Sequence, residues 1–173
     1  MLILTKKVFV VVKSTAISLV IAVFIINFIF QIVTVNGESM FPTLQNNDKL
    51  ILEKVSYRII PAKRNDIVVI KYPADIGQRI IKRVIAVAGD KVKISDNIIY
   101  INGKIINEYY KNESIMRDYD ETIVPKGSMF VLGDNRNFSK DSRSSDIGFV
   151  KLNLLEGKAV IRLYPFNKMG RIR

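Results

Sequence analysis

The chain has 173 residues, with 27 Lys or Arg and 16 Asp or Glu, so it carries a net charge of +11, and it contains neither Cys nor His. Without these two residue types, a histidine general base, a thiol nucleophile, a disulfide and a Cys/His zinc site are all excluded. Any enzymatic proton transfer must therefore use Lys, Asp, Glu, Tyr or water. The length suits one domain with a small addition.

An apolar run near the N-terminus holds much of the chain's hydrophobic content, which is 49% overall. Ser14–Val35 carries no charge, and as a helix it would be about 33 Å long, enough to cross the hydrocarbon core of a bilayer. A buried helix of a soluble protein is the alternative, but apolar residues surround the whole circumference. We therefore predict a transmembrane helix over residues 14–35.

The charges before this run predict its orientation. Lys6, Lys7 and Lys13 precede it, so the positive-inside rule makes residues 1–13 a short cytoplasmic segment. Residues 36–173 are then an extracytoplasmic domain, and we expect a single-pass protein of the plasma membrane. No A-x-A-like cleavage site follows the run, which favours a retained anchor over a cleaved signal peptide.

Short β-branched runs separated by Gly, Pro, Asn and Asp follow Asn36, a pattern typical of an all-β domain. Asn102 and Gly103 both tolerate the positive φ of a type I′ turn and predict a hairpin. The polar segment Asn107–Thr122 has weak periodicity and is expected to leave the sheet. Strands are predicted at Lys49–Val55, Ile67–Tyr72, Arg79–Ala88, Lys91–Ile94, Ile98–Ile101, Lys104–Ile106, Ser128–Leu132 and Lys158–Tyr164. The predicted fold class is mainly β: a mostly antiparallel sandwich or irregular barrel after one transmembrane helix.

Three stretches contain more specific polar residues than a β scaffold requires: Gly37–Leu44, Arg79–Arg83 and Gly133–Arg143. In the first, Ser39 lies within about 14 Å of the end of the apolar run even in a fully extended chain. A nucleophile at this position would meet its substrate at the membrane surface. The alternative interpretation of this stretch is a solvated turn before a proline.

Lys82, in the second stretch, is the candidate base. In a strand, Lys82 shares a face with Ile80 and Val84, while Arg79 and Arg83 point to the other side. Burial on an apolar face disfavours the charged ammonium and lowers the lysine pKa from about 10.4 toward neutrality. A lysine whose charge reaches solvent from an exposed strand is the alternative.

The third stretch has the composition of a loop. Here the Ser139 hydroxyl would hold the Lys82 amine, and Asp141 with Arg143 would form a pair that fixes the loop. A turn held by Asx hydrogen bonds and Asp–Arg pairs, with or without a bound cation, is the alternative that spacing alone leaves open.

Together these stretches resemble the bacterial type I signal peptidases, which are membrane-anchored serine endopeptidases with a Ser-Lys dyad. Four of the family's motifs occur in the family's order. They are S-M-x-P-T at Ser39–Thr43, D-I-V-V at Asp66–Val69, K-R-V-I-x-x-x-G-D at Lys82–Asp90 and G-D-N-x-x-x-S-x-D-S-R at Gly133–Arg143. The resemblance covers most of the chain from Val33 to Val150.

The resemblance implies that Ser39 is the nucleophile, Lys82 the general base and Ser139 the residue that orients the lysine amine. Residues implied to support the site are Asp134, Asp141, Arg143, Arg83 and Gly37, and those implied to line the substrate pockets are Val33, Val35, Met40 and Ile81. No metal or cofactor is implied.

Two positions depart from patterns within the family. Gly37 stands where some members have a serine whose hydroxyl assists the oxyanion hole, which leaves the Ser39 backbone N–H as the donor. Asn137–Phe138 replaces a more usual Asp-Asn, and we expect this change to tune activity rather than abolish it.

The expected partners are signal-peptide-bearing precursor proteins and the phospholipid membrane, and no nucleic acid is expected. Four alternatives stay open or are disfavoured. A membrane-anchored β-rich binding module for an anionic wall polymer would leave the Ser39 and Lys82 motifs unexplained. DNA capture is disfavoured because Lys and Arg are dispersed and no aromatic residues interleave with them. A Ser-Lys protease dedicated to a conjugation or pilus substrate stays open as an alternative, whereas soluble self-cleaving repressors do not fit the apolar run.

Overall fold

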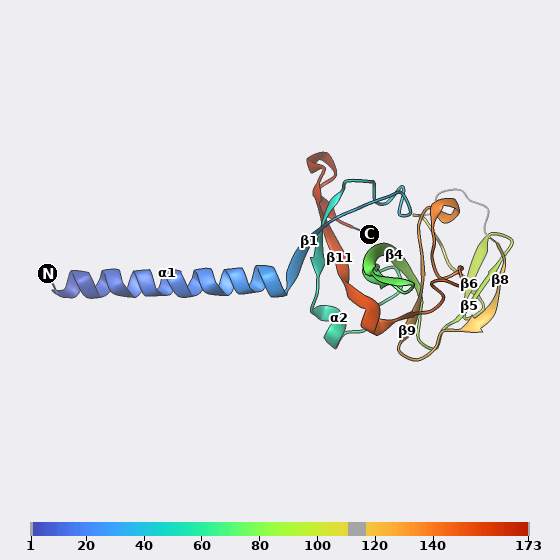
Figure 1. The fold of residues 1–173 in the computed structure, drawn as a ribbon, viewed down its shortest axis with the longest axis horizontal. Helices are drawn as coiled ribbons and strands as arrows, with labels where there is room; N and C mark the ends of the chain where they lie inside the picture. Colours follow the sequence, from blue (N-terminus) through green and yellow to red (C-terminus); the bar gives the residue numbers. More distant parts are fainter. Residues whose placement is uncertain (1, 111–116, 173) are drawn as a thin grey trace.

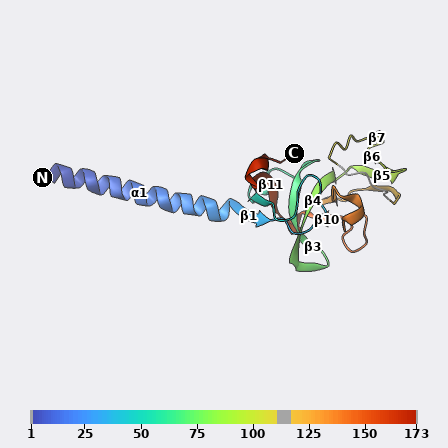
Figure 2. The ribbon, with the colours of Figure 1, turned by 90° about the horizontal axis from the view of Figure 1, so that it is seen from above.

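One long apolar helix and two antiparallel β-sheets make up the chain in a computed structural model that describes residues 2–110 and 117–172. Helix α1 (Leu2–Phe28) projects away from the β domain in both Figure 1 and Figure 2. Within it, Lys6–Phe24 has a mean hydropathy of 2.1 and none of it is buried against the rest of the chain. By length and composition this helix can cross a membrane.

α1 is longer at its N-terminal end than the helix predicted over residues 14–35, and it corrects the other end of that prediction because it stops at Phe28. The helix begins at Leu2, so it includes most of the short segment predicted at residues 1–13. No Gly or Pro interrupts the sequence up to Phe28, which allows a continuous helix. It ends at Phe28, and residues 30–34 form strand β1 instead. There the β-branched residues pair with β2, which satisfies their backbone groups outside a helix.

The larger sheet has eight strands in the order β1-β2-β11-β3-β4-β9-β10, with β12 paired to β11. Its strands are β1 (Phe30–Thr34), β2 (Lys49–Glu53), β3 (Ile67–Tyr72), β4 (Asp75–Val87), β9 (Ser128–Leu132), β10 (Val150–Lys151), β11 (Leu155–Tyr164) and β12 (Gly170–Arg171). Every pairing in it is antiparallel. β1 therefore forms one edge, and β4 is unpaired before Arg83 on the side away from β3 among the described residues.

The smaller sheet, in the order β7-β6-β5-β8, lies at the end of the β domain far from α1 (Figures 1 and 2). Its strands are β5 (Lys91–Ser95), β6 (Ile98–Ile101), β7 (Lys104–Ile105) and β8 (Tyr119–Ile123). The remaining elements are helix α2 (Ser56–Ile59) and the 3₁₀ turns η1 (Arg136–Phe138), η2 (Leu152–Leu154) and η3 (Phe166–Lys168).

The antiparallel sheets confirm the predicted mainly β fold class, and each predicted strand is present within a few residues. The predicted hairpin is also confirmed, because Asn102 and Gly103 have φ of 53° and 76° between the paired strands β6 and β7. The prediction for Asn107–Thr122 is wrong at its end, where β8 pairs with β5. Residues 111–116 of that segment lie outside the described residues.

Three clusters of buried apolar side chains form the core. One of them contains Met40 and Leu44 from the loop after β1, packed with Leu50 of β2 and Ile67 of β3. Another lies between the two sheets and includes Phe130 of β9, which has no exposed surface. Strand β9 leads directly into the Gly133–Arg143 loop, so the packing of Phe130 helps to position that loop.

Phe130→Ala should lower the free energy of unfolding by about 3–5 kcal/mol, because it removes a fully buried ring and leaves a cavity beside Tyr119 and Phe149. Urea unfolding of the full-length protein in detergent, followed by near-ultraviolet circular dichroism, measures this change. Phe166→Ala is the matched control, because Phe166 is 78% exposed and its loss should change stability by no more than about 0.5 kcal/mol. Equal effects of the two substitutions would contradict this assignment of the core.

Candidate active site

Ser39 lies in the loop between β1 and β2, and the loop is held from both sides. Gly37 has a φ of 93°, a conformation that favours glycine, and its N–H donates to Asn46 Oδ1 at 2.9 Å. After Ser39 the chain turns, with the Leu44 N–H donating to the Met40 carbonyl at 2.8 Å. The side chains of Met40 and Leu44 are buried, so this turn cannot move without disrupting the core.

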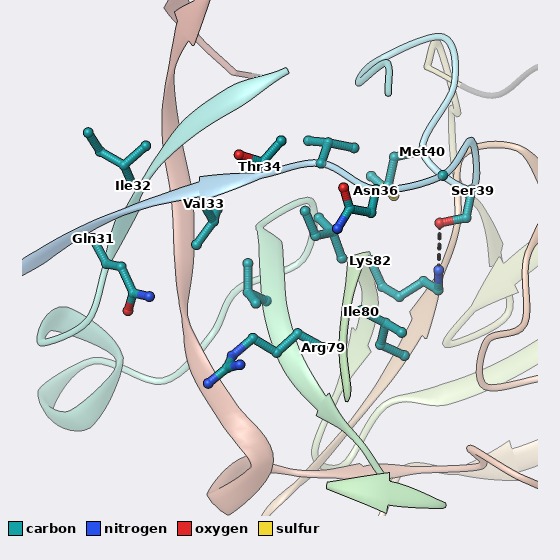
Figure 3. A pocket seen from close by; sticks show the side chains of 14 residues that line it. Gln31, Ile32, Val33, Thr34, Asn36, Ser39, Met40, Arg79, Ile80 and Lys82 are labelled. Atoms are coloured by element: carbon teal, nitrogen blue, oxygen red, sulfur yellow. Dashed lines mark hydrogen bonds between the residues drawn. The ribbon is translucent and has the colours of Figure 1, made fainter. Parts of the chain in front are cut away.

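Lys82 of β4 points at this loop, and its Nζ donates a hydrogen bond to Ser39 Oγ at 2.7 Å (Figure 3). The residue is only 3% exposed. Burial lowers the pKa of the Lys82 amine from 10.5 to about 8, against the opposing effect of the nearby Asp141 and Asp134 carboxylates and with a smaller contribution from Arg143. A neutral amine can then accept the proton of the hydroxyl that it contacts.

Arg83, the next residue, forms a buried ion pair with Asp134. Its Nε and Nη2 donate to the two Asp134 carboxylate oxygens at 2.8 and 2.7 Å, and neither side chain has exposed surface. Asp134 also accepts a hydrogen bond of 2.5 Å from the Thr43 hydroxyl, and the Arg83 guanidinium lies 3.9 Å from the centre of the Tyr110 ring. The pair therefore connects β4, the Ser39 loop and the start of the Gly133–Arg143 loop.

A second set of contacts holds the Gly133–Arg143 loop itself. Asp141 accepts two hydrogen bonds of 2.8 Å from the Arg143 guanidinium and one of 3.1 Å from the Gly133 N–H. Arg136 donates to the Gly133 carbonyl at 2.8 Å and forms a buried ion pair with Glu108 at 2.5 Å. These contacts close the loop around Gly133.

Ser139 is next to this site but makes no hydrogen bond to the Lys82 amine, contrary to the prediction. Its Oγ is buried and has no hydrogen-bond partner among the described residues, because the Lys82 amine is directed at Ser39 instead. Ser139 and the Ser39 carbonyl both pack against Gly133, and a Cβ atom there would collide with both. The neighbouring Asn137 and Phe138 are exposed, Phe138 by 75%. The pair that replaces the more usual Asp-Asn of the family therefore lies on the surface.

A groove of about 500 Å³ runs from the Ser39–Lys82 pair between β1 and residues 79–82 of β4 (Figure 3). The residues that were predicted to line substrate pockets, Val33, Val35, Met40 and Ile81, all lie along it. Among the described residues, no group of three or more metal-ligating side chains is arranged to hold a metal ion.

Sequence reasoning missed several residues of the site. Glu108 and Tyr110 lie in the segment that was expected to leave the sheet, and nothing local indicates that they reach Arg136 and Arg83. Thr43, although part of a recognised motif, was given no role, yet it contacts Asp134. Gln31, Asn36 and Arg79 line the groove without having been predicted to do so.

Comparison with known proteins shows which family the chain belongs to. The model of the family described as "Signal peptidase, peptidase S26" matches residues 8–164. Signal peptidase I of Bacillus caldolyticus is 38% identical over 157 residues, covering 83% of this chain and 84% of that protein. Signal peptidase IB of Staphylococcus aureus (strain COL) is 33% identical over 173 residues, covering 90% of this chain and 88% of that protein.

Among solved structures, a signal peptidase I from Enterococcus faecalis V583 has 38% sequence identity and a TM-score of 0.50, and the match covers 56% of this chain and 95% of that one. The fold and the comparisons define a peptidase with a β-rich domain. The chain belongs to the signal peptidase family, peptidase S26, and is a serine endopeptidase of the signal peptidase I type.

Gly133→Ala should lower kcat/KM for precursor cleavage by about 100-fold or more, because the new methyl group would push the Ser39 backbone or Ser139 out of place. Cleavage of a purified precursor, followed by gel electrophoresis, measures the loss. Gly77→Ala is the matched control, because a Cβ at this exposed position meets only the end of the Asp75 side chain, 3.2 Å away. Near-normal cleavage by the Gly133 variant would show that this close approach does not position Ser39 for cleavage.

Proposed function

We propose that Ser39 is the nucleophile and Lys82 the general base of a membrane-anchored signal peptidase that cleaves exported precursors at the outer face of the plasma membrane. The observation that carries this proposal is the 2.7 Å hydrogen bond between Lys82 Nζ and Ser39 Oγ, made by a lysine that is almost fully buried. The supporting residues are Gly37, Arg83, Asp134, Ser139, Asp141 and Arg143.

In the first half-reaction, Ser39 Oγ attacks the scissile carbonyl carbon while neutral Lys82 accepts the hydroxyl proton. The Ser39 backbone N–H makes no hydrogen bond to a described residue, so it can donate to the oxyanion that forms. When the C–N bond breaks, Lys82 returns the proton to the leaving amine, which leaves an ester on Ser39. Water then attacks the ester carbonyl carbon while Lys82 accepts its proton. When the ester C–O bond breaks, Lys82 gives this proton to Ser39 Oγ, and the product leaves with a new carboxyl group.

The lowered pKa decides how much base is available. With a pKa of about 8, about a fifth of the Lys82 amine is neutral at pH 7.4, whereas an ordinary lysine would be neutral in only about one molecule in a thousand. Burial therefore raises the concentration of active base by about two orders of magnitude. No histidine is needed.

The substrate would lie as an extended strand in the groove, between β1 and residues 79–82 of β4. Both of these strand edges have backbone groups unpaired on the groove side among the described residues. The apolar side chains of Val33, Val35, Met40 and Ile81 suit small residues at the first and third positions before the scissile bond. The precursor would thus complete hydrogen bonds that the sheet leaves open.

The anchor supports the proposed location. α1 ends at Phe28 and β1 begins at Phe30, so the groove starts where the apolar helix stops. Lys6, Lys7 and Lys13 lie in the N-terminal half of α1, and the positive-inside rule places that end in the cytoplasm. A precursor held in the membrane by its own apolar segment would then present its cleavage site at the level of Ser39.

Ser39→Ala and Lys82→Met should each abolish precursor cleavage. Lys82→Met should also raise the free energy of unfolding at pH 7 by about 1–3 kcal/mol, because the ammonium is charged in both states there and only the folded state buries it. This gain in the free energy of unfolding should shrink as pH rises from 8 toward 10.5. In that range the folded wild type buries a neutral amine, and the remaining cost of losing the proton falls as pH approaches the ordinary lysine pKa. Cleavage assays and chemical unfolding of the full-length protein measure the two effects.

Lys93→Met is the matched control for this pair, because Lys93 is exposed on β5 and should change neither cleavage nor stability appreciably. Normal processing by the Lys82 variant would refute the dyad, and a loss of activity together with a loss of stability would mean that the lysine is structural.

The pH dependence of kcat/KM should rise with a midpoint near 8, because only the neutral Lys82 amine accepts the serine proton. Initial rates of precursor cleavage between pH 6 and pH 11 measure this rise in kcat/KM. A limb that rises only near 10.5, the ordinary lysine value, would mean that burial does not tune the base.

A further inference from the structure

The end of the groove far from the dyad is polar. Figure 3 shows Arg79 and Gln31 at the opposite end of the view from the Ser39–Lys82 hydrogen bond, and both residues line the groove. Gln31 comes from β1 and Arg79 from β4, so the two strands that would hold the substrate each supply one donor there. The apolar residues predicted to hold the substrate do not account for this end.

Arg79 is a positioned donor with unused capacity. Its Nε donates to Glu156 Oε2 of β11 at 2.5 Å, which holds the guanidinium in place. Neither Nη group makes a hydrogen bond to a described residue, and the side chain is 56% exposed. An arginine held by one carboxylate therefore still presents two N–H-bearing nitrogens to whatever occupies the groove.

The spacing along β4 says which part of a substrate would reach these donors. Arg79 is three residues before Lys82, a distance of about 10 Å along a strand. If the scissile carbonyl is at Ser39, an extended substrate places roughly its fourth to sixth residues before the bond beside the Arg79 guanidinium, since the side chain adds further reach. That is beyond the small residues next to the cleavage site.

In a precursor, this is where the apolar segment of the signal peptide ends. Inside a bilayer that segment must be helical, because its backbone groups have no other hydrogen-bond partners. The last four carbonyls of any helix lack an internal partner and carry the negative end of the helix dipole. They need donors and favour a cation.

The end of α1 lies close in the chain to this polar end of the groove. α1 ends at Phe28, three residues before Gln31, so Gln31 lies close to the plane where an apolar helix leaves the hydrocarbon. A signal-peptide helix lying beside α1 would end at the same plane. Its free carbonyls would face Gln31 and Arg79.

We propose that Arg79, held by Glu156 and assisted by Gln31, binds the unpaired C-terminal carbonyls of the signal peptide's apolar helix. This inference rests on the proposed function, since it assumes that the scissile bond lies at Ser39. Arg79 is then a substrate-positioning residue that binds the C-terminal end of the signal-peptide helix. The site would thereby measure the distance from the end of the helix to the bond that is cut.

The test compares two substrates of the full-length enzyme in detergent micelles: a complete precursor and a peptide that begins at the third residue before the scissile bond. Arg79→Gln should lower kcat/KM for the precursor by about two- to fivefold and leave the short peptide unchanged. Arg79→Lys should recover part of the loss, because it keeps the cation but not the planar fork. Lys91→Gln is the matched control, since Lys91 also pairs with a carboxylate, Glu121, at an exposed position on β5 outside the groove.

Equal losses on both substrates, or no loss on the precursor, would overturn the proposal. A second measurement compares precursor cleavage in vesicles with and without anionic lipid. It distinguishes binding of the signal-peptide helix by Arg79 from binding of lipid phosphate. A defect that appears only with anionic lipid overturns the proposal, and one that persists in neutral lipid supports it. Failure of the dyad is recognised separately, because Ser39→Ala would then keep its activity on both substrates.

Discussion

The buried ion pair between Arg83 and Asp134 is the contact on which the site depends. It joins β4 to the loop after β9, and through the Thr43 hydroxyl it reaches the loop that carries Ser39. Neither charged side chain touches solvent, so loss of one partner would leave an uncompensated charge in the core, which costs about 3–5 kcal/mol. Three segments that are far apart in the chain are thus held together by this bidentate contact and the Thr43 hydrogen bond.

Two adjacent basic residues have opposite electrostatic roles because they face opposite sides of β4. The guanidinium of Arg83 is always charged, and the Asp134 carboxylate and the face of the Tyr110 ring compensate this charge. Lys82 is directed at a hydroxyl, and Asp141 and Asp134 act on it without a direct hydrogen bond, so burial dominates and lowers its pKa. The strand alternation thereby separates a permanent structural cation from a base that can be neutral.

The groove owes its shape to the change from helix to strand after Phe28. Had the helix continued to Val35, as its apolar composition permits, Val33 would lie on a helix and could not form an edge opposite β4. Pairing with β2 makes residues 30–34 the edge of the larger sheet and buries Val35 in the cluster that also holds Met40. The same short segment thus connects the apolar helix, one wall of the groove and the loop that carries Ser39.

The sequence by itself determined the features that depend on local patterns. These are the apolar helix, eight of the twelve strands in the described residues, and the turn at Asn102 and Gly103. The resemblance of four ordered motifs to a known family added the pairing of Ser39 with Lys82. Only the tertiary structure decided that β1 is a strand, that Tyr119–Ile123 joins the smaller sheet, that Glu108 reaches Arg136 and that Ser139 makes no hydrogen bond to Lys82. Each of these depends on a partner distant in the chain. The pKa of Lys82 is of the same kind, because desolvation is a property of the packed environment around the amine and not of the residues beside it in the sequence.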